Sequence, residues 1–260
     1  MPFVHTELYQ KITRQTGRAI GDFQLIKEND SILAAVSGGK DSLLLLYLLK
    51  EFQKKSPVPF HITAVHLNQS QDGKTYQVLE EIFQEWDISY KIVHEDTHSI
   101  VKQKIPEGSI MCPMCSRLRR GILYRTAREL KCNKIALGHH ADDLLETFLM
   151  NAFFSGKLGS MTPIYRTGEG DLFVIRPLVY VSEKMILDFV QSMGWPVEAC
   201  SQCGSSEILR RSQMKDLLLD LEKKFPGIKQ SLSGALKNPH VNELLDKQLW
   251  GSPDYAIPND

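Results

Sequence analysis

The chain has 260 residues, of which 42% are hydrophobic and 24% are charged. This composition is typical of a globular protein with one large domain and small additions, and it excludes a fibrous or disordered chain. Because 31 Lys and Arg balance 31 Asp and Glu, any nucleic-acid binding has to come from local clusters of charge. Without an 18-residue apolar run or a signal-peptide core, we expect a cytoplasmic protein that makes no membrane contact.

Short apolar runs alternate with helical segments along the chain. In chain order we expect a helix at 6–27, a strand at 31–36, a helix at 42–50, a strand at 60–67, a helix at 76–86, a strand at 89–93, a helix at 115–130, a strand at 134–138, a helix at 142–154, a strand at 172–175 and helices at 182–193 and 206–225. This alternation predicts an α/β fold with a doubly wound, mostly parallel sheet. We expect an N-terminal helical segment (1–30), the sheet domain (31–180) and a C-terminal helical region (181–260).

A glycine-rich loop follows the first expected strand and opens the next helix. It reads Ser37-Gly38-Gly39-Lys40-Asp41-Ser42. Adjacent glycines allow a tight turn with inward N–H groups, and a helix N-terminus adds positive potential, so the loop suits a phosphate. Lys40 can neutralise that phosphate, and Asp41 suits a helix cap or a Mg²⁺ contact. The spacing differs from G-x-x-x-x-G-K-[ST]; an ordinary turn is the structural alternative.

A second motif ends the fourth expected strand and reads Gly138-His139-His140-Ala141-Asp142-Asp143. Ligands of doubly wound sheets lie beyond the carboxyl ends of strands, so both motifs are expected to face one crevice. Asp142 and Asp143 are then expected to place Mg²⁺ against the phosphates, or else to cap the following helix. Gly138, His139 and also His66, at the end of the second strand, are expected to contact the nucleotide.

Four of the five cysteines form two C-x-x-C pairs, Cys112 with Cys115 and Cys200 with Cys203. Two-residue spacing lets both sulfurs of a pair converge on one metal centre. Zinc, an iron–sulfur cluster and a redox dithiol all fit this pattern, and unliganded cysteines are the structural alternative. Cys132 stands alone and is expected to be structural.

Basic residues gather between Ile100 and Asp142, around and after the first cysteine pair, and only Glu107 and Glu129 oppose them before the second motif. Such a strip favours a phosphate backbone as partner, with a solvated helix face as the alternative. The candidate nucleic-acid contacts are Arg117, Arg120, Arg125, Arg128, Arg210 and Arg211.

Together these segments resemble the tRNA 2-thiocytidine biosynthesis family, which lies within the PP-loop, or N-type, ATP pyrophosphatases. The likeness rests on SGGKDS at 37–42, IPEGSIMCPMCSRLRRGILYRTA at 105–127, ALGHHADDLLET at 136–147, GKLGSM at 156–161, IRPL at 175–178 and CSQCGSS at 200–206. It runs from the N-terminal helix to about residue 225.

The resemblance implies a function. Members replace the 2-oxygen of cytidine 32 in the tRNA anticodon loop by sulfur, using ATP, Mg²⁺ and a [4Fe–4S] cluster held by three cysteines. Their sulfur comes from a cysteine desulfurase, and they act as cytoplasmic dimers. Carried over to this chain, the resemblance implies Cys112, Cys115 and Cys203 as cluster ligands and Cys200 as a persulfide carrier or a spare thiol. Lys40, Asp41, Asp142 and Asp143 would serve the ATP chemistry.

Two departures keep other interpretations open. The segment HLNQSQDGKTYQVLEE at 66–81 differs from the family pattern, and Ala141 stands where a basic residue is common. A related enzyme that thiolates another tRNA base or a carrier is therefore the first alternative. The second is a zinc-stapled RNA-binding protein with a vestigial nucleotide loop.

Overall fold

The computed structural model describes residues 6–68, 75–95, 112–196 and 206–245. Its strands are β1 (Asp30–Ala35), β2 (Phe60–Asn68), β3 (Ser89–His94), β4 (Lys134–Ala136), β5 (Ile164–Arg166) and β6 (Phe173–Ile175). Its helices are α1 (Glu7–Asp22), α2 (Lys40–Lys55), α3 (Thr75–Glu85), α5 (Cys112–Glu129), α6 (Ala141–Ser155), α7 (Glu183–Met193), α8 (Ser206–Lys224) and α9 (Ile228–Ala235), with a 3-10 helix at Val241–Glu243.

These strands form one sheet in the order β3-β2-β1-β4-β6-β5. Every described pairing is parallel except the antiparallel pair of β5 and β6. The chain runs outward from β1 to β3 and then crosses back to place β4 on the other side of β1. The predicted doubly wound sheet is therefore confirmed, with its switch point between β1 and β4, where ligands of such sheets bind.

Three elements differ from the expected pattern. The structure adds the edge strand β5 and the helix α9, which were not expected. The first helix ends at Asp22 rather than at residue 27, because Gln24 (φ 50°) and then Asn29 (φ 62°) adopt left-handed conformations that a helix cannot contain.

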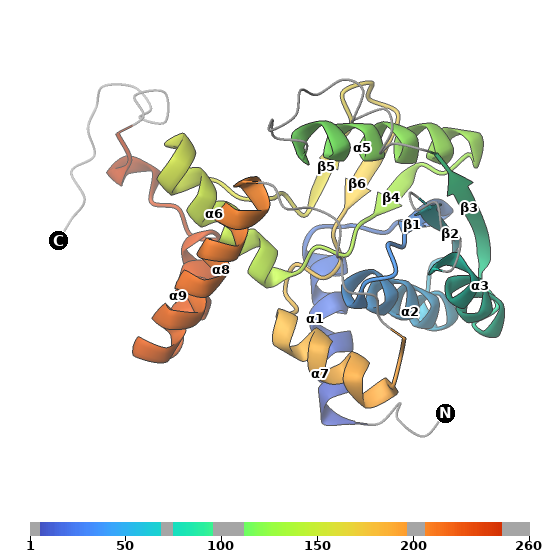
Figure 1. The fold of residues 1–260 in the computed structure, drawn as a ribbon, viewed down its shortest axis with the longest axis horizontal. Coiled ribbons are helices and arrows are strands. Elements are labelled where there is room, and N and C mark those ends of the chain that lie inside the picture. Colours follow the sequence, from blue (N-terminus) through green and yellow to red (C-terminus); the bar gives the residue numbers. More distant parts are fainter. Residues whose placement is uncertain (1–5, 69–74, 96–111, 197–205, 246–260) are drawn as a thin grey trace.

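The sheet separates two hydrophobic layers (Figure 1). Helices α1, α2, α3 and α7 pack on one face, and α5 covers the other. Helix α2 is buried around its circumference, because Leu43, Leu44, Leu45, Leu46, Leu48 and Leu49 are all fully buried. Such an all-apolar helix is held on every side, so the loop that opens it is anchored in the core.

A third apolar cluster holds the C-terminal helices. Leu145 and Leu149 of α6 pack against Met214 and Leu218 of α8, and α6, α8 and α9 stand together beside the sheet (Figure 1). Helix α7, by contrast, packs in the main core with α1 and α2. Within the described residues, no helix has the length and apolarity that crossing a membrane requires.

Candidate active site

The glycine loop is a compact turn between β1 and α2. Gly38 has φ +89°, a conformation that a side chain disfavours. The Ser37 amide donates to Ser42 Oγ at 3.1 Å, the two hydroxyl oxygens lie 3.2 Å apart, and Ser42 Oγ donates to the Gly39 carbonyl at 2.9 Å. The N-cap of α2 is Gly39, which has no side chain to accept from the first-turn N–H groups. The loop therefore holds its shape through its own serines and offers amides to an anion.

Two residues outside the loop support it. His66 is 4% exposed, and its Nδ1 lies 2.8 Å from the Val36 carbonyl oxygen, just before the loop. At Gly138, a Cβ would lie 3.0 Å from both the Asp41 carbonyl carbon and the Ser42 amide nitrogen. The second motif can approach the first so closely only because residue 138 is glycine. The two motifs therefore meet, as predicted, and a shared nucleotide site between them stays a prediction.

Lys40 is the cation at the centre of the crevice. Its Nζ lies 3.0 Å from Asp41 Oδ2 and 3.1 Å from Glu183 Oε1. Burial alone would lower the pKa of Lys40, but the two carboxylates outweigh it and raise that pKa. Lys40 is therefore charged at neutral pH and suited to bind a phosphate.

One carboxylate oxygen at this site has no hydrogen-bond partner among the described residues. Asp41 Oδ1 is buried, and His140 Nε2 lies 3.7 Å from it. Carboxylate oxygens beside phosphates are the ligands that Mg²⁺ prefers. The residues present thus fit a magnesium ion between Asp41 and a bound triphosphate.

Asp143 and Asp142 were both expected to hold Mg²⁺. In the structure, their carboxylates contact other protein groups instead. Asp143 forms a capping box with His140, whose amide donates to Asp143 Oδ2 at 2.9 Å, and its Oδ1 accepts from Arg211 at 3.3 Å. It therefore caps its own helix, as the structural alternative expected. A metal role for Asp143 remains a prediction.

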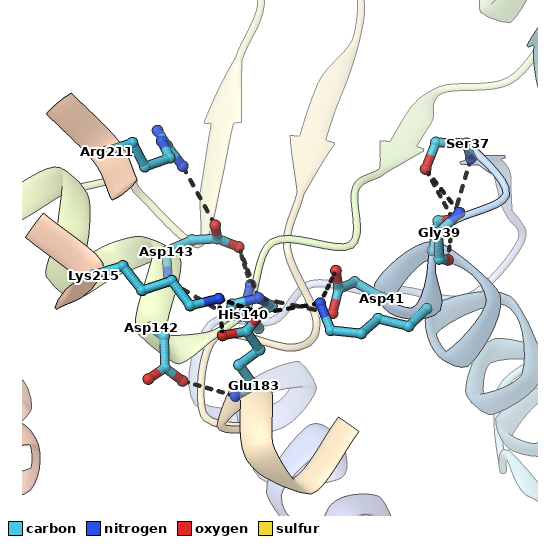
Figure 2. Close-up of polar contacts among 11 residues, drawn as sticks. Ser37, Gly39, Asp41, His140, Asp142, Asp143, Glu183, Arg211 and Lys215 are labelled. Carbon is cyan, nitrogen blue, oxygen red and sulfur yellow. Dashed lines mark hydrogen bonds and ion pairs between the residues drawn. The ribbon is translucent and has the colours of Figure 1, made fainter. Parts of the chain in front are cut away.

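Asp142 braces two other helices. It accepts from the Glu183 amide and from Lys229 Nζ, both at 2.7 Å. Burial would raise the pKa of Asp142, but the bond from Lys229 outweighs it and lowers that pKa. Asp142 thereby ties the start of α6 to the start of α7 (Figure 2) and, through Lys229, to α9.

Glu183 is the main site residue that the sequence motifs did not single out. Lys215 binds its carboxylate at 2.8 and 2.6 Å, in addition to the contact with Lys40. Burial would raise the pKa of Glu183, but the two lysines bring it down to about 2. The sequence showed Ser182 and Glu183 only as the start of a helix, because nothing local indicates that α8 delivers Lys215 to that point.

His139 is neutral at physiological pH. Burial, together with Arg176, Arg211 and His140, lowers its pKa to about 4, although Asp143 acts in the opposite direction. Its Nδ1 accepts from Arg176 Nε at 3.3 Å. His139 can therefore hydrogen-bond a nucleotide but cannot neutralise its phosphate charge.

The cysteines are only partly described. Cys112 and Cys115 lie in the first turn of α5. Since α5 is the crossover helix between the parallel strands β3 and β4, it runs antiparallel to them and its N-terminus lies at the carboxyl edge of the sheet. Cys200 and Cys203 lie outside the described residues. Cys132 is buried and unpaired, in line with the structural role expected for it.

The basic strip divides into paired and unpaired arginines. Arg128 contacts Asp171 at 2.6 and 3.1 Å and Glu169 at 2.6 Å, and Arg125 pairs with Glu95. Two exposed side chains, Arg117 and Arg120, form no ion pair with any described residue. Arg210 lies over the Phe154 ring at 5.1 Å, and Arg211 joins the crevice through Asp143.

Comparisons with known proteins agree with this geometry. The model of the PP-loop domain family matches residues 8–206. The tRNA-cytidine(32) 2-sulfurtransferase of Ralstonia pickettii (strain 12J) is 46% identical over 94% of this chain and 77% of that protein. Its namesake from Idiomarina loihiensis is 48% identical over 94% of this chain and 81% of that protein.

Solved structures point the same way. The U34-tRNA thiolase NcsA from Methanococcus maripaludis, solved with its [4Fe-4S] cluster, superposes with a TM-score of 0.71 at 27% identity, over 88% of this chain and 78% of that one. An NH3-dependent NAD synthetase from Campylobacter jejuni, at 18% identity and a TM-score of 0.50, shares the fold over 89% of this chain and 94% of that one.

The fold and the crevice at its switch point are those of a PP-loop, ATP-using enzyme. Within that class, the chain belongs to the tRNA-cytidine(32) 2-sulfurtransferase family.

Proposed function

We propose that this enzyme uses ATP to activate the 2-oxygen of cytidine 32 in tRNA and replaces it with sulfur. The observation that carries the proposal is the contact between the glycine loop and the second motif at the switch point, in a chain 46–48% identical to enzymes of that name. A neighbour that thiolates uridine 34 supports a second candidate, the same chemistry on another tRNA base.

The chain's own residues account for the activation step. A pyrimidine 2-oxygen is a poor leaving group. When it attacks the α-phosphorus of ATP, the bond to the bridging oxygen breaks, pyrophosphate departs, and the oxygen can later leave as part of AMP. The first-turn amides of α2 and Lys40 stabilise the charge that develops on pyrophosphate. Mg²⁺ bound at Asp41 would supply further positive charge to the same oxygens.

For the sulfur step, Cys112, Cys115 and Cys203 are the proposed ligands of a [4Fe–4S] cluster, and Cys200 is the proposed persulfide carrier. Cysteine thiolates are soft ligands, and soft ligands favour iron–sulfur clusters. A cluster held by three cysteines supplies one iron with an open coordination position for sulfur. Helix α8 starts three residues after Cys203 and carries Arg211 and Lys215 into the crevice, which supports nearness of the second pair to the ATP site. The sulfur source would be a cysteine desulfurase, and the enzyme would act as a cytoplasmic homodimer.

The first test is the removal of the central cation. Lys40→Ala is expected to abolish tRNA-dependent release of pyrophosphate from ATP without unfolding the protein. Lys184→Ala is the control and should retain activity, because it removes an equally charged lysine whose ion-pair partner among the described residues is the exposed Asp188. Wild-type pyrophosphate release by Lys40→Ala would refute the nucleotide assignment.

The second test concerns the metal. After anaerobic purification, Cys112→Ala, Cys115→Ala and Cys203→Ala are each expected to lose iron and the broad visible absorbance, while Cys132→Ser keeps both. Cys200→Ala should keep the cluster and lose sulfur transfer. A colourless wild-type protein that contains zinc instead of iron would favour the zinc-stapled RNA-binding alternative.

A further inference from the structure

Lys40, the proposed phosphate ligand, already contacts a carboxylate from another helix. Glu183 Oε1 lies 3.1 Å from Lys40 Nζ, and Lys215 of α8 holds the same carboxylate at 2.8 and 2.6 Å (Figure 2). The side chains of Lys40 and Glu183 are only 21% and 24% exposed, so this pair is partly shielded from water and salt. One carboxylate is thus shared between two ammonium groups, one of which belongs to the glycine loop.

The backbone at Glu183 is held in place at the start of α7. Ser182 caps the start of α7, and the Glu183 amide donates to Asp142 Oδ2 at 2.7 Å. Bound phosphates and the Glu183 carboxylate must therefore compete for Lys40. The alternative partner of Glu183, Lys215, is already in contact with it, so its charge stays paired when a phosphate takes Lys40.

We infer that Glu183 is a positioning residue that competes with phosphate for Lys40, and that Lys215 retains Glu183 while phosphate is bound. The inference rests on the proposed function, because it takes ATP and pyrophosphate as the ligands of Lys40. Its consequence concerns release. Pyrophosphate carries several negative charges and would otherwise be held tightly, whereas a carboxylate that is ready to replace it on Lys40 weakens that hold.

The arrangement predicts opposite effects for two substitutions. Glu183→Gln removes the competing charge, so Mg²⁺–pyrophosphate should bind about twofold to fivefold more tightly, the range expected for a partly exposed charge pair. Lys215→Met removes the alternative partner and leaves Glu183 to Lys40, so pyrophosphate should bind more weakly by a similar factor. In the double variant the affinity should equal that of Glu183→Gln, because Lys215 has no carboxylate left to retain.

Isothermal titration of the full-length protein with Mg²⁺–pyrophosphate measures all three variants. Lys184→Met is the matched control, because Lys184 directly follows Glu183 in the chain and its side chain is 81% exposed. The affinity of this variant for Mg²⁺–pyrophosphate should equal that of wild type. In steady-state assays, Glu183→Gln should also lower the inhibition constant of pyrophosphate. Melting temperatures show whether each variant is folded.

Weaker or unchanged pyrophosphate binding by a folded Glu183→Gln would overturn the inference. The inference also fails if Lys215→Met weakens binding equally in the wild-type and Glu183→Gln backgrounds, since Lys215 would then contact the phosphates directly. Pyrophosphate binding involves neither tRNA nor sulfur. Either result therefore leaves the proposed thiolation intact, and a failure of thiolation would leave this result standing.

Discussion

Gly138 is the residue at which the two halves of the site touch. Gly138→Ala would place a methyl group 3.0 Å from the backbone of Asp41 and Ser42, so the start of α2 must shift. We expect a loss of about 1–3 kcal/mol in the free energy of unfolding, the usual range for overpacking, together with weaker ATP binding. Urea unfolding and ATP titration measure the two effects.

Gly121→Ala is the matched control for that change. Gly121 lies inside α5, and a Cβ there would meet nothing within 4 Å. Since alanine favours a helix over glycine by about 0.5–1 kcal/mol, this variant should be slightly more stable than wild type. If both variants had the same stability, the close approach at Gly138 would be of no energetic importance.

Glu146 makes stability depend on pH in a predictable direction. It is 4% exposed, and burial, with the charge of Asp143, raises its pKa to about 7. Between pH 4.5 and 7 the folded protein therefore binds a proton that the unfolded chain has lost, so this group lowers stability as pH rises. The free energy of unfolding of Glu146→Gln, taken relative to that of wild type, should therefore rise by roughly 1–3 kcal/mol from pH 5 to pH 8. Urea unfolding at both pH values tests this, and an equal difference at both would contradict it.

At the scale of elements, α8 matters because it delivers Arg211 and Lys215 to the crevice. Leu218 is 1% exposed in the cluster that joins α8 to α6. Leu218→Ala should cost about 2–5 kcal/mol of stability and weaken ATP binding, because α8 loosens. Leu219→Ala, at a neighbouring position that is 42% exposed, should change neither. Equal unfolding curves for the two variants would show that α8 does not depend on this contact.

Helix α5 carries two groups of arginines: Arg117 and Arg120 form no ion pair with a described residue, whereas Arg125 and Arg128 do. Arg117→Ala with Arg120→Ala should weaken tRNA binding and flatten its log–log salt dependence by about two units, one for each phosphate that is no longer neutralised. Arg128→Ala should lower stability instead, because its partners Asp171 and Glu169 belong to the turn before β6. Filter binding at several salt concentrations measures the salt dependence of tRNA binding for each variant. The assignment fails if only Arg128→Ala alters the log–log slope.

The length of an element and the residues around it decide whether the sequence could predict it. The strands β1 and β2 and the helices α2 and α6 contain distinct apolar runs, and both site motifs are continuous in sequence. Strand β5 has three residues, Ile164–Arg166, and is only partly buried, so it shows no alternation. Helix α9 follows Pro226 and Gly227, which locally indicate a break.

At the scale of the whole molecule, the site is completed by residues that lie far apart in the chain. Lys40, Asp142, Glu183, Lys215 and Lys229 come from five different helices. Glu183, Lys215 and Lys229 look like ordinary surface charges in their own segments, since only the packing of α7, α8 and α9 around the switch point brings them to Lys40 and Asp142. For the same reason, the basic strip that looks uniform in sequence divides into paired and unpaired side chains once the fold forms.

The central claim is that this enzyme thiolates cytidine 32 of tRNA with the use of ATP bound at Lys40. Mass spectrometry of tRNA nucleosides from a strain that lacks the gene tests it most directly, with the wild-type gene or the Lys40→Ala variant returned to that strain. We expect 2-thiocytidine at position 32 to be absent from the deletion strain, restored by the wild-type gene and not restored by Lys40→Ala. Unchanged 2-thiocytidine in the deletion strain, or full restoration by Lys40→Ala, would contradict the claim.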